Sequence, residues 1–128
     1  MSYLLDTHLL IWIAKSDPKL PTAVAEIIDE PANTLYFSTV AIWEIAIKRG
    51  LDRPDFRADP SALRAGLLQS GYVELPIESR HVLALTALPP HHRDPFDRLL
   101  VAQAVTEGMT LLTHDARVAR YSDAIRLY

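Results

Sequence analysis

Two aspartates, Asp94 and Asp97, lie three positions apart where the sequence pattern predicts the start of a helix. Asp94 suits the N-cap, and Pro95 suits the first helical position because the N–H that proline lacks would have no helical partner there. The positions that follow are mostly apolar and predict a buried helix: Phe96, Leu99, Leu100, Val101, Ala102 and Ala104. Two carboxylates would then lie one turn apart at the positive end of a buried helix. This pair fits helix capping, and it also fits a functional acidic site.

Asp6 and Asp115 each follow a short apolar run that predicts a buried strand, over residues 3–5 and 109–113 respectively. Functional sites in parallel sheets form beyond the carboxyl ends of the strands. We therefore expect both aspartates, together with Thr113, at one edge of a sheet. A simple role for Asp6 as the N-cap of the following helix is the alternative.

Glu44 is the only charged residue in the first eight positions of a helix predicted over residues 39–49. Its neighbours three and four positions away are mostly apolar: Val40, Ala41, Ile47 and Lys48. A buried carboxylate costs several kcal/mol unless a cation compensates its charge or it stays protonated. Lys48, one turn further along the helix, is one candidate partner, and a bound cation is the other.

Four acids are thus candidates for one cluster, with Asp94 beside them: Asp6, Glu44, Asp97 and Asp115. Like charges brought together repel unless a cation compensates them. Carboxylate ligands and the absence of cysteine favour Mg²⁺ or Mn²⁺. Two such ions can activate a water molecule and stabilise the leaving oxygen of a phosphodiester. Thr113 is expected to hydrogen-bond a carboxylate or a metal-bound water. Four histidines near the acids in the sequence are expected to support the ligands or to face a substrate: His8, His91, His92 and His114.

The segments that would position these acids alternate between strands and helices. Strands are predicted over residues 3–5, 34–37, 72–77, 109–113 and 124–127. Helices are predicted over residues 7–14, from about 17–21 to 29, and over 39–49, 61–70, 78–88, 95–107 and 116–121, with an irregular loop over 51–60. This alternation predicts an α/β three-layer fold with a mostly parallel sheet.

Length and composition narrow the possible classes of protein. The 128 residues suit one domain spanning the chain, and 49% apolar and 23% charged residues are typical of a globular protein. Without cysteine there is no disulfide and no thiolate metal site, which fits a reducing compartment such as the cytoplasm. No signal peptide or membrane span is expected. The net charge of −3 means that nucleic acid would be met by local arginines or by metal ions held on acids.

Four segments carry a resemblance to a known family, and they occur in that family's order: LLDTH at 4–8, STVAIWEI at 38–45, HRDPFDRLLVAQA at 92–104 and LTHD at 112–115. At these residues the chain resembles PIN domains, and specifically VapC-type toxin ribonucleases. The resemblance implies a three-layer α/β/α PIN fold with strand order 3-2-1-4-5. It also implies an Mg²⁺- or Mn²⁺-dependent endoribonuclease in which metal-bound water attacks the phosphorus in line, leaving 5′-phosphate and 3′-hydroxyl products.

The resemblance also implies the roles of individual acids. The three core acids of the family match Asp6, Glu44 and Asp97, and Asp115 matches the more variable fourth. Asp97 is favoured over Asp94 because it stands at the usual distance before the small residues at 102–104, so Asp94 is a cap, an auxiliary ligand or both. Many relatives have a further acid where this chain has Arg117, so a second metal is expected to bind weakly or only with RNA present.

Partners follow from the same resemblance: a homodimer and a cognate antitoxin whose tail covers the acidic groove. The nearest basic groups for the RNA backbone are Arg93, Arg98, Arg117 and Arg120. Trp12 and Trp43 are both candidates for lining the groove, and packing in the core is the favoured interpretation for Trp43.

Other functions fit parts of the pattern. A PIN nuclease of RNA processing or DNA cleavage, which is not a toxin, has the same acids. A degenerate PIN domain that only binds partners is disfavoured because all four acids are present. A metal-dependent switch of the receiver type is disfavoured because Asp6 is followed by Thr7 rather than a second acid, and no lysine follows Lys48.

Overall fold

The five strands form one parallel sheet in the order β3-β2-β1-β4-β5, as the sequence and the family resemblance predicted. The structure is a computed structural model that describes residues 1–90, 94–121 and 125–128. The strands are β1 Ser2–Leu5, β2 Thr34–Ser38, β3 Val73–Leu75, β4 Thr110–Thr113 and β5 Ile125–Leu127. β1 lies at the centre, where Leu4 is in register with Tyr36 of β2 and Leu111 of β4.

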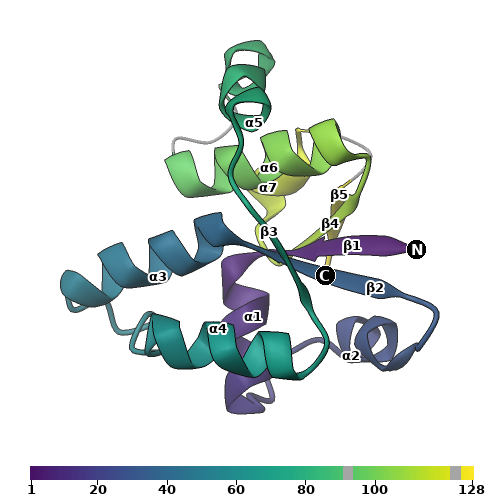
Figure 1. Cartoon of the computed structure of the whole chain (residues 1–128), viewed down its shortest axis with the longest axis vertical. Helices are drawn as coiled ribbons and strands as arrows, with labels where there is room; N and C mark the ends of the chain where they lie inside the picture. Colours follow the sequence, from purple (N-terminus) through teal and green to yellow (C-terminus); the bar gives the residue numbers. More distant parts are fainter. Residues whose placement is uncertain (91–93, 122–124) are drawn as a thin grey trace.

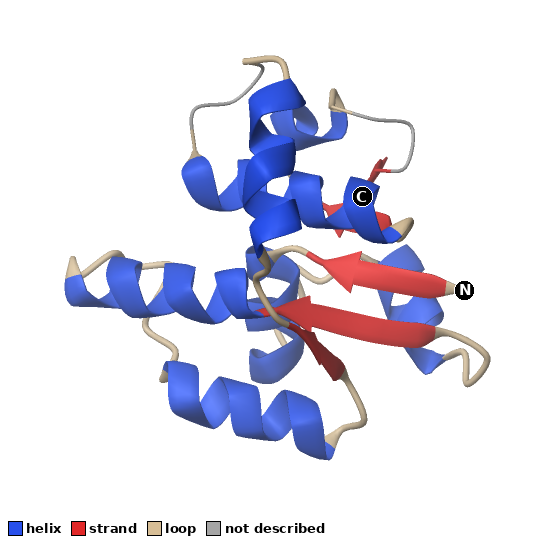
Figure 2. Cartoon of the chain, turned by 45° about the horizontal axis from the view of Figure 1, so that its top comes forward, coloured by secondary structure: helices blue, strands red, loops and turns tan. Residues whose placement is uncertain are grey.

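Helices cover both faces of this sheet and complete the predicted three layers (Figure 1). They are α1 Thr7–Lys15, α2 Thr22–Asp29, α3 Thr39–Gly50, α4 Pro60–Gln69, α5 Ser79–Ala84, α6 Pro95–Glu107 and α7 Ala116–Ala119, with a 3-10 turn, η1, at Leu85–Ala87. α1, α2 and α4 lie on one side of the sheet and α6 and α7 on the other (Figures 1 and 2). α3 extends away from the carboxyl end of β2 and contacts both α4 and α6.

Successive side chains along the central strands pack into two hydrophobic cores, one on each face of the sheet. Tyr3 and Leu5 of β1 pack with the core that includes α1 and α4, whereas Leu4 between them packs with the α6 core. The neighbouring strand β4 repeats the pattern, since Leu111 and Leu112 belong to opposite cores. Side chains of successive strand residues point to opposite faces, so a strand buried on both faces must be apolar throughout.

Several elements are shorter than predicted, for local reasons. The second helix begins only at Thr22, because the Asp17 carboxylate accepts a hydrogen bond from the Lys19 N–H in a separate turn before it. β3 ends before Pro76, which has no N–H for the ladder. The helix predicted over 78–88 divides into α5 and η1, and α7 ends at Ala119 rather than at 121. Position 124, predicted as the start of the last strand, lies outside the described residues.

No helix in the described ranges combines the length and apolar character needed to cross a bilayer.

Candidate active site

Asp6 joins three elements at the carboxyl edge of the sheet. It follows β1, it is the N-cap of α1, and its side chain is buried with 6% exposed. One oxygen, Oδ1, accepts from the Leu9 N–H at 3.0 Å. The other, Oδ2, accepts from the Thr113 hydroxyl at 2.6 Å and from the His114 N–H at 3.0 Å, both at the end of β4. Capping therefore uses one oxygen, and the predicted bond from Thr113 orients the other.

Glu44 projects from α3 into the same region and is 2% exposed. Its Oε1 accepts from the Thr7 hydroxyl at 2.5 Å, and its Oε2 lies 2.6 Å from the ammonium of Lys48. Lys48, the partner considered from the sequence, also lies 3.2 Å from Asp94 Oδ2. Burial lowers the pKa of Lys48, but the two carboxylates outweigh this effect and hold the pKa above its ordinary value. Lys48 is therefore charged and bridges two acids.

Asp94 and Asp97 lie at the start of α6, as the pattern predicted. Asp94 is the N-cap, and its Oδ1 accepts from the N–H groups of Phe96 at 2.9 Å and Asp97 at 3.3 Å. Burial, the largest cause, and the charges of four neighbouring carboxylates together raise the pKa of Asp97 to about 8; these neighbours are Asp94, Glu44, Asp6 and Asp115. An acid in this state marks a place where negative charge is under-compensated.

Asp115 is the N-cap of α7 beyond β4. Its Oδ1 accepts from the Arg117 N–H at 2.8 Å, and its Oδ2 lies 3.4 Å from the Arg117 guanidinium. The Asp115 N–H donates to the Thr113 hydroxyl at 3.0 Å. Because that hydroxyl donates to Asp6, Thr113 links the two aspartates at the ends of β1 and β4.

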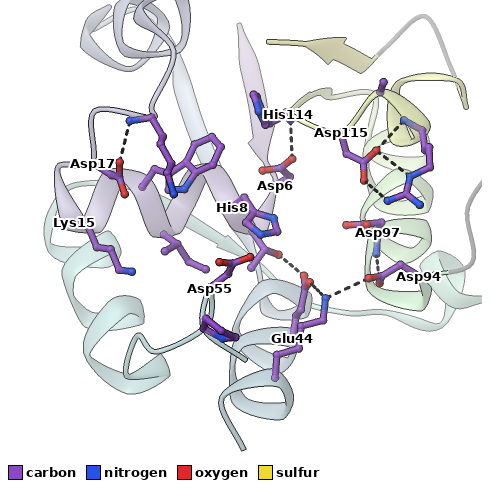
Figure 3. Close-up of a pocket in the computed structure, with 18 residues that line it drawn as sticks. Asp6, His8, Lys15, Asp17, Glu44, Asp55, Asp94, Asp97, His114 and Asp115 are labelled. Carbon is purple, nitrogen blue, oxygen red and sulfur yellow. Dashed lines mark hydrogen bonds and ion pairs between the residues drawn. The ribbon is translucent and has the colours of Figure 1, made fainter. Parts of the chain in front are cut away.

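These acids share one pocket of about 580 Å³ (Figure 3). All five predicted acids line it, and two further aspartates, Asp17 and Asp55, join them. Among the described residues, its lysines and arginines are Lys15, Lys19, Lys48 and Arg117. The pocket therefore combines an excess of carboxylates with a few cations around them, which suits a metal ion together with an anionic substrate.

The donor set fits a hard divalent cation. Oxygens of Glu44, Asp94 and Asp97 lie within 4.8 Å of one another. Carboxylate oxygens are the ligands that Mg²⁺ and Mn²⁺ prefer. The raised pKa of Asp97 gives the same indication, because a cation at this place would relieve the repulsion that keeps the proton on it.

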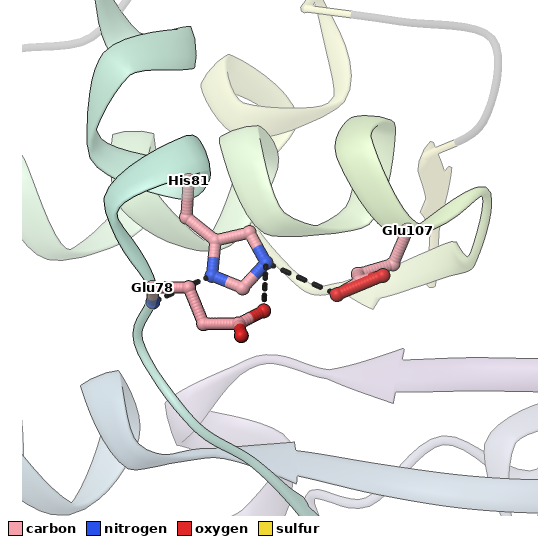
Figure 4. Close-up of side chains that lie close together, drawn as sticks. All are labelled: Glu78, His81 and Glu107. Carbon is pink, nitrogen blue, oxygen red and sulfur yellow. Dashed lines mark hydrogen bonds and ion pairs between the residues drawn. The ribbon is translucent and has the colours of Figure 1, made fainter.

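Among the described residues, a second acidic group containing a histidine lies away from the pocket, between α5 and α6 (Figure 4). His81 is fully buried, and its Nδ1 accepts from the Glu78 N–H at 3.0 Å. In the neutral ring the proton is then on Nε2, which donates to Glu107 Oε1 at 3.1 Å. Since neither ring nitrogen offers a free lone pair to a metal, this cluster ties α5 to the end of α6, and His81 has a structural role there.

Only some of the basic and aromatic residues predicted from the sequence to lie near the site line the pocket. Arg117 lines the pocket, whereas Arg98 is half-buried and donates from Nη2 to the Leu85 carbonyl at 3.4 Å. Arg93, His91 and His92 lie outside the described residues. Trp12, His8 and His114 line the pocket. The expectation that Trp43 packs in the core is wrong: it is 44% exposed and meets the Phe96 ring edge-on, because its position on α3 faces outward.

Sequence reasoning missed two groups at the site. Thr7 holds Glu44, and the link from Lys48 to Asp94 crosses from α3 to α6. Thr7 stands next to Asp6 in the sequence, but nothing in the residue spacing indicates that its hydroxyl contacts Glu44, 37 positions further along the chain.

The chain belongs to the PIN domain family, whose family model matches residues 3–124. A comparison with curated proteins finds no match. Among solved structures, VapBC2 from Rickettsia felis, bound to a promoter DNA fragment, has a TM-score of 0.70 at 15% identity, covering 100% of this chain and 98% of that one. DNA-bound VapBC from Salmonella typhimurium has a TM-score of 0.68 at 15% identity, covering 100% of this chain and 97% of that one. VapBC-1 from nontypeable Haemophilus influenzae has a TM-score of 0.63 at 20% identity, covering 99% of this chain and 98% of that one. At these identities the likeness establishes a shared fold.

Proposed function

We propose that this protein is a metal-dependent endoribonuclease that hydrolyses RNA phosphodiester bonds, and that it is the toxin of a toxin–antitoxin pair. One observation carries the chemistry: carboxylates from the ends of β1 and β4 and from helices α3 and α6 line one pocket. Membership of the PIN domain family supports the same proposal, and the resemblance described above matches these acids to the family's core acids.

The acids proposed to hold the metal and to carry catalysis are Asp6, Glu44, Asp97 and Asp115, with Asp94 as an auxiliary group. Mg²⁺ or Mn²⁺ bound there would supply an activated water and stabilise the leaving oxygen. Oxygen-only ligands support these two cations over softer metals.

The protein's own groups prepare this site. Thr113 and the His114 N–H hold Asp6 Oδ2 in one orientation, which reduces the reorganisation needed when a cation arrives. Asp97 carries a proton near neutral pH and must release it to become an ionic ligand. Arg117 lines the pocket beside Asp115 and is the proposed contact for an RNA phosphate. Arg98, which donates to the Leu85 carbonyl, and Arg93, which lies outside the described residues, remain candidates.

The proposed partners are RNA as substrate, a cognate antitoxin that covers the pocket, and a second copy of the chain in a homodimer. The three solved structures that share this fold are VapBC toxin–antitoxin complexes, which supports the proposal of an antitoxin partner. The absence of cysteine is compatible with a cytoplasmic location.

The test is metal-dependent cleavage of a mixed RNA pool and metal-dependent thermal melting, with the Asp6→Asn variant beside the wild type. Mg²⁺ or Mn²⁺ should raise the melting temperature and support cleavage in the wild type alone. Asp55→Asn is the matched control, because Asp55 lines the same pocket but is exposed and lies outside the acid cluster. It should retain both responses. If the wild type responds to neither metal, the acids are caps and surface charges, and the domain is a binding module.

Toxicity needs its own readout. Expression of the wild type should arrest bacterial growth, and expression of Asp97→Asn should not. Cleavage in vitro without growth arrest would favour a PIN nuclease of RNA processing.

A further inference from the structure

Lys48 places a positive charge inside the acidic cluster. Its side chain is 14% exposed, and its ammonium lies 2.6 Å from Glu44 Oε2 and 3.2 Å from Asp94 Oδ2. The rings of Phe56 and Phe96 lie 4.7 and 5.5 Å from the same nitrogen and screen it from water. The ammonium is therefore held in place by two acids and two rings.

The same two acids belong to the group that could hold a divalent cation. Oxygens of Glu44, Asp94 and Asp97 lie within 4.8 Å of one another, and Lys48 contacts two of these three side chains. A divalent ion bound among these oxygens would lie within a few Å of the ammonium, and the repulsion between the two cations is poorly screened in a partly buried site.

We propose that Lys48 is an internal counter-ion that competes with the divalent metal for the Glu44 and Asp94 side of the site. This inference rests on the proposed metal-dependent function. Without metal, Lys48 neutralises these acids and holds α3 against α6. When metal binds, the ammonium must leave at least one of the two carboxylates, so the lysine lowers the affinity of the site for metal.

The other acids have different partners. Asp6 is held by neutral donors, from Thr113 and two backbone N–H groups, and Asp115 is paired with Arg117, whose side chain is mostly exposed. Lys48 is less exposed than Arg117 and bridges two acids, so its competition with metal should be the stronger of the two.

The test measures the affinity for Mn²⁺ at fixed pH and salt, with the electron paramagnetic resonance signal of free Mn²⁺ as the readout. The variant Lys48→Met should bind Mn²⁺ about tenfold more tightly than the wild type, or more, because one opposing charge is removed. Lys48→Arg keeps the charge and should stay within about threefold of the wild type. Lys15→Met is the matched control: Lys15 lines the same pocket but is exposed, so its loss should change affinity by less than about threefold.

Equal or weaker Mn²⁺ binding by Lys48→Met than by the wild type overturns the competition. An equal gain in Lys15→Met also overturns it, because the effect would then reflect net charge alone. If neither the wild type nor any variant binds Mn²⁺, the metal site itself fails, and the proposed function fails with it.

Lys48→Met leaves the buried Glu44 without its cation, so this variant is expected to melt at a lower temperature than the wild type in metal-free buffer. If it is unfolded there, binding is followed as Mn²⁺-dependent folding by circular dichroism. Folding at Mn²⁺ concentrations below the wild-type Kd supports the proposal. Failure to fold at concentrations that saturate the wild type overturns it.

Discussion

Replacing Asp97, a proposed metal ligand, by asparagine should increase the free energy of unfolding of the metal-free protein. Burial and four neighbouring carboxylates raise the pKa of Asp97 from 3.8 to about 8. The folded protein therefore keeps a proton on Asp97 that the unfolded chain loses at lower pH. Such a group costs stability as the pH rises from about 4 to about 8, and the full cost is present above the folded pKa. Asparagine has no proton to lose and escapes this cost.

The size of the effect follows from the two pKa values. At 1.36 kcal/mol for each unit, the difference between 3.8 and about 8 corresponds to about 6 kcal/mol above pH 8, and to about 4 kcal/mol at pH 7. Water and counter-ions reach this half-buried site and will reduce the measured gain to roughly 2–4 kcal/mol at pH 7. For a domain of this size, that gain raises the melting temperature by roughly 10 °C.

The assay is urea unfolding of both proteins in chelator-treated buffer between pH 5 and pH 9. The stability difference should be smallest at pH 5 and should grow with pH until about pH 8. Asp55→Asn, at an exposed position on the same pocket, controls for the loss of one negative charge and should change stability by less than about 0.5 kcal/mol. A destabilised Asp97→Asn protein, or a difference independent of pH, would refute the reasoning. Saturating Mg²⁺ should reverse the order, because only the wild type gains binding energy.

Two further predictions concern residues that support the site or the fold. Thr113→Val removes the hydroxyl that donates to Asp6 and accepts from the Asp115 N–H, so we expect a loss of about 1–3 kcal/mol in urea unfolding and weaker Mn²⁺ binding. Unchanged Mn²⁺ affinity in this variant would show that the bond serves the fold alone. Gly108→Ala places a side chain at a φ of 67° at the end of α6, so we expect a loss of about 1 kcal/mol with RNA cleavage unchanged. Unaltered stability would contradict the strain argument.

Three acids of the pocket also stabilise the fold as helix caps. Asp6, Asp94 and Asp115 are all N-caps, and each uses one oxygen for the backbone of its helix. The second oxygen of each faces a partner within the site. A helix N-terminus favours a negative charge, so capping lets the fold hold several carboxylates near one another. Capping therefore does not use both oxygens of these aspartates, and a role as cap is compatible with the proposed role as ligand.

The sequence by itself determined the elements and their order. Short apolar runs with an acid close behind them predicted β1 and β4. The start of α6 followed from Asp94 and Pro95, because capping and helix initiation depend on residues within one turn. The two-faced burial of the central strands followed from their continuous apolar character. Local interactions of this kind can be read from neighbouring residues.

Only the tertiary structure decided which groups meet across the chain. Thr113 reaches Asp6 from 107 positions away, and Lys48 bridges Glu44 to Asp94 across two helices. The raised pKa of Asp97 depends on burial and on acids from four separate segments, so no local pattern contains it. The outward position of Trp43 was likewise invisible, because an apolar helix does not show from its sequence which of its faces is covered. These features depend on how elements pack, and packing brings together residues whose spacing in the sequence is unrelated to their distance in space.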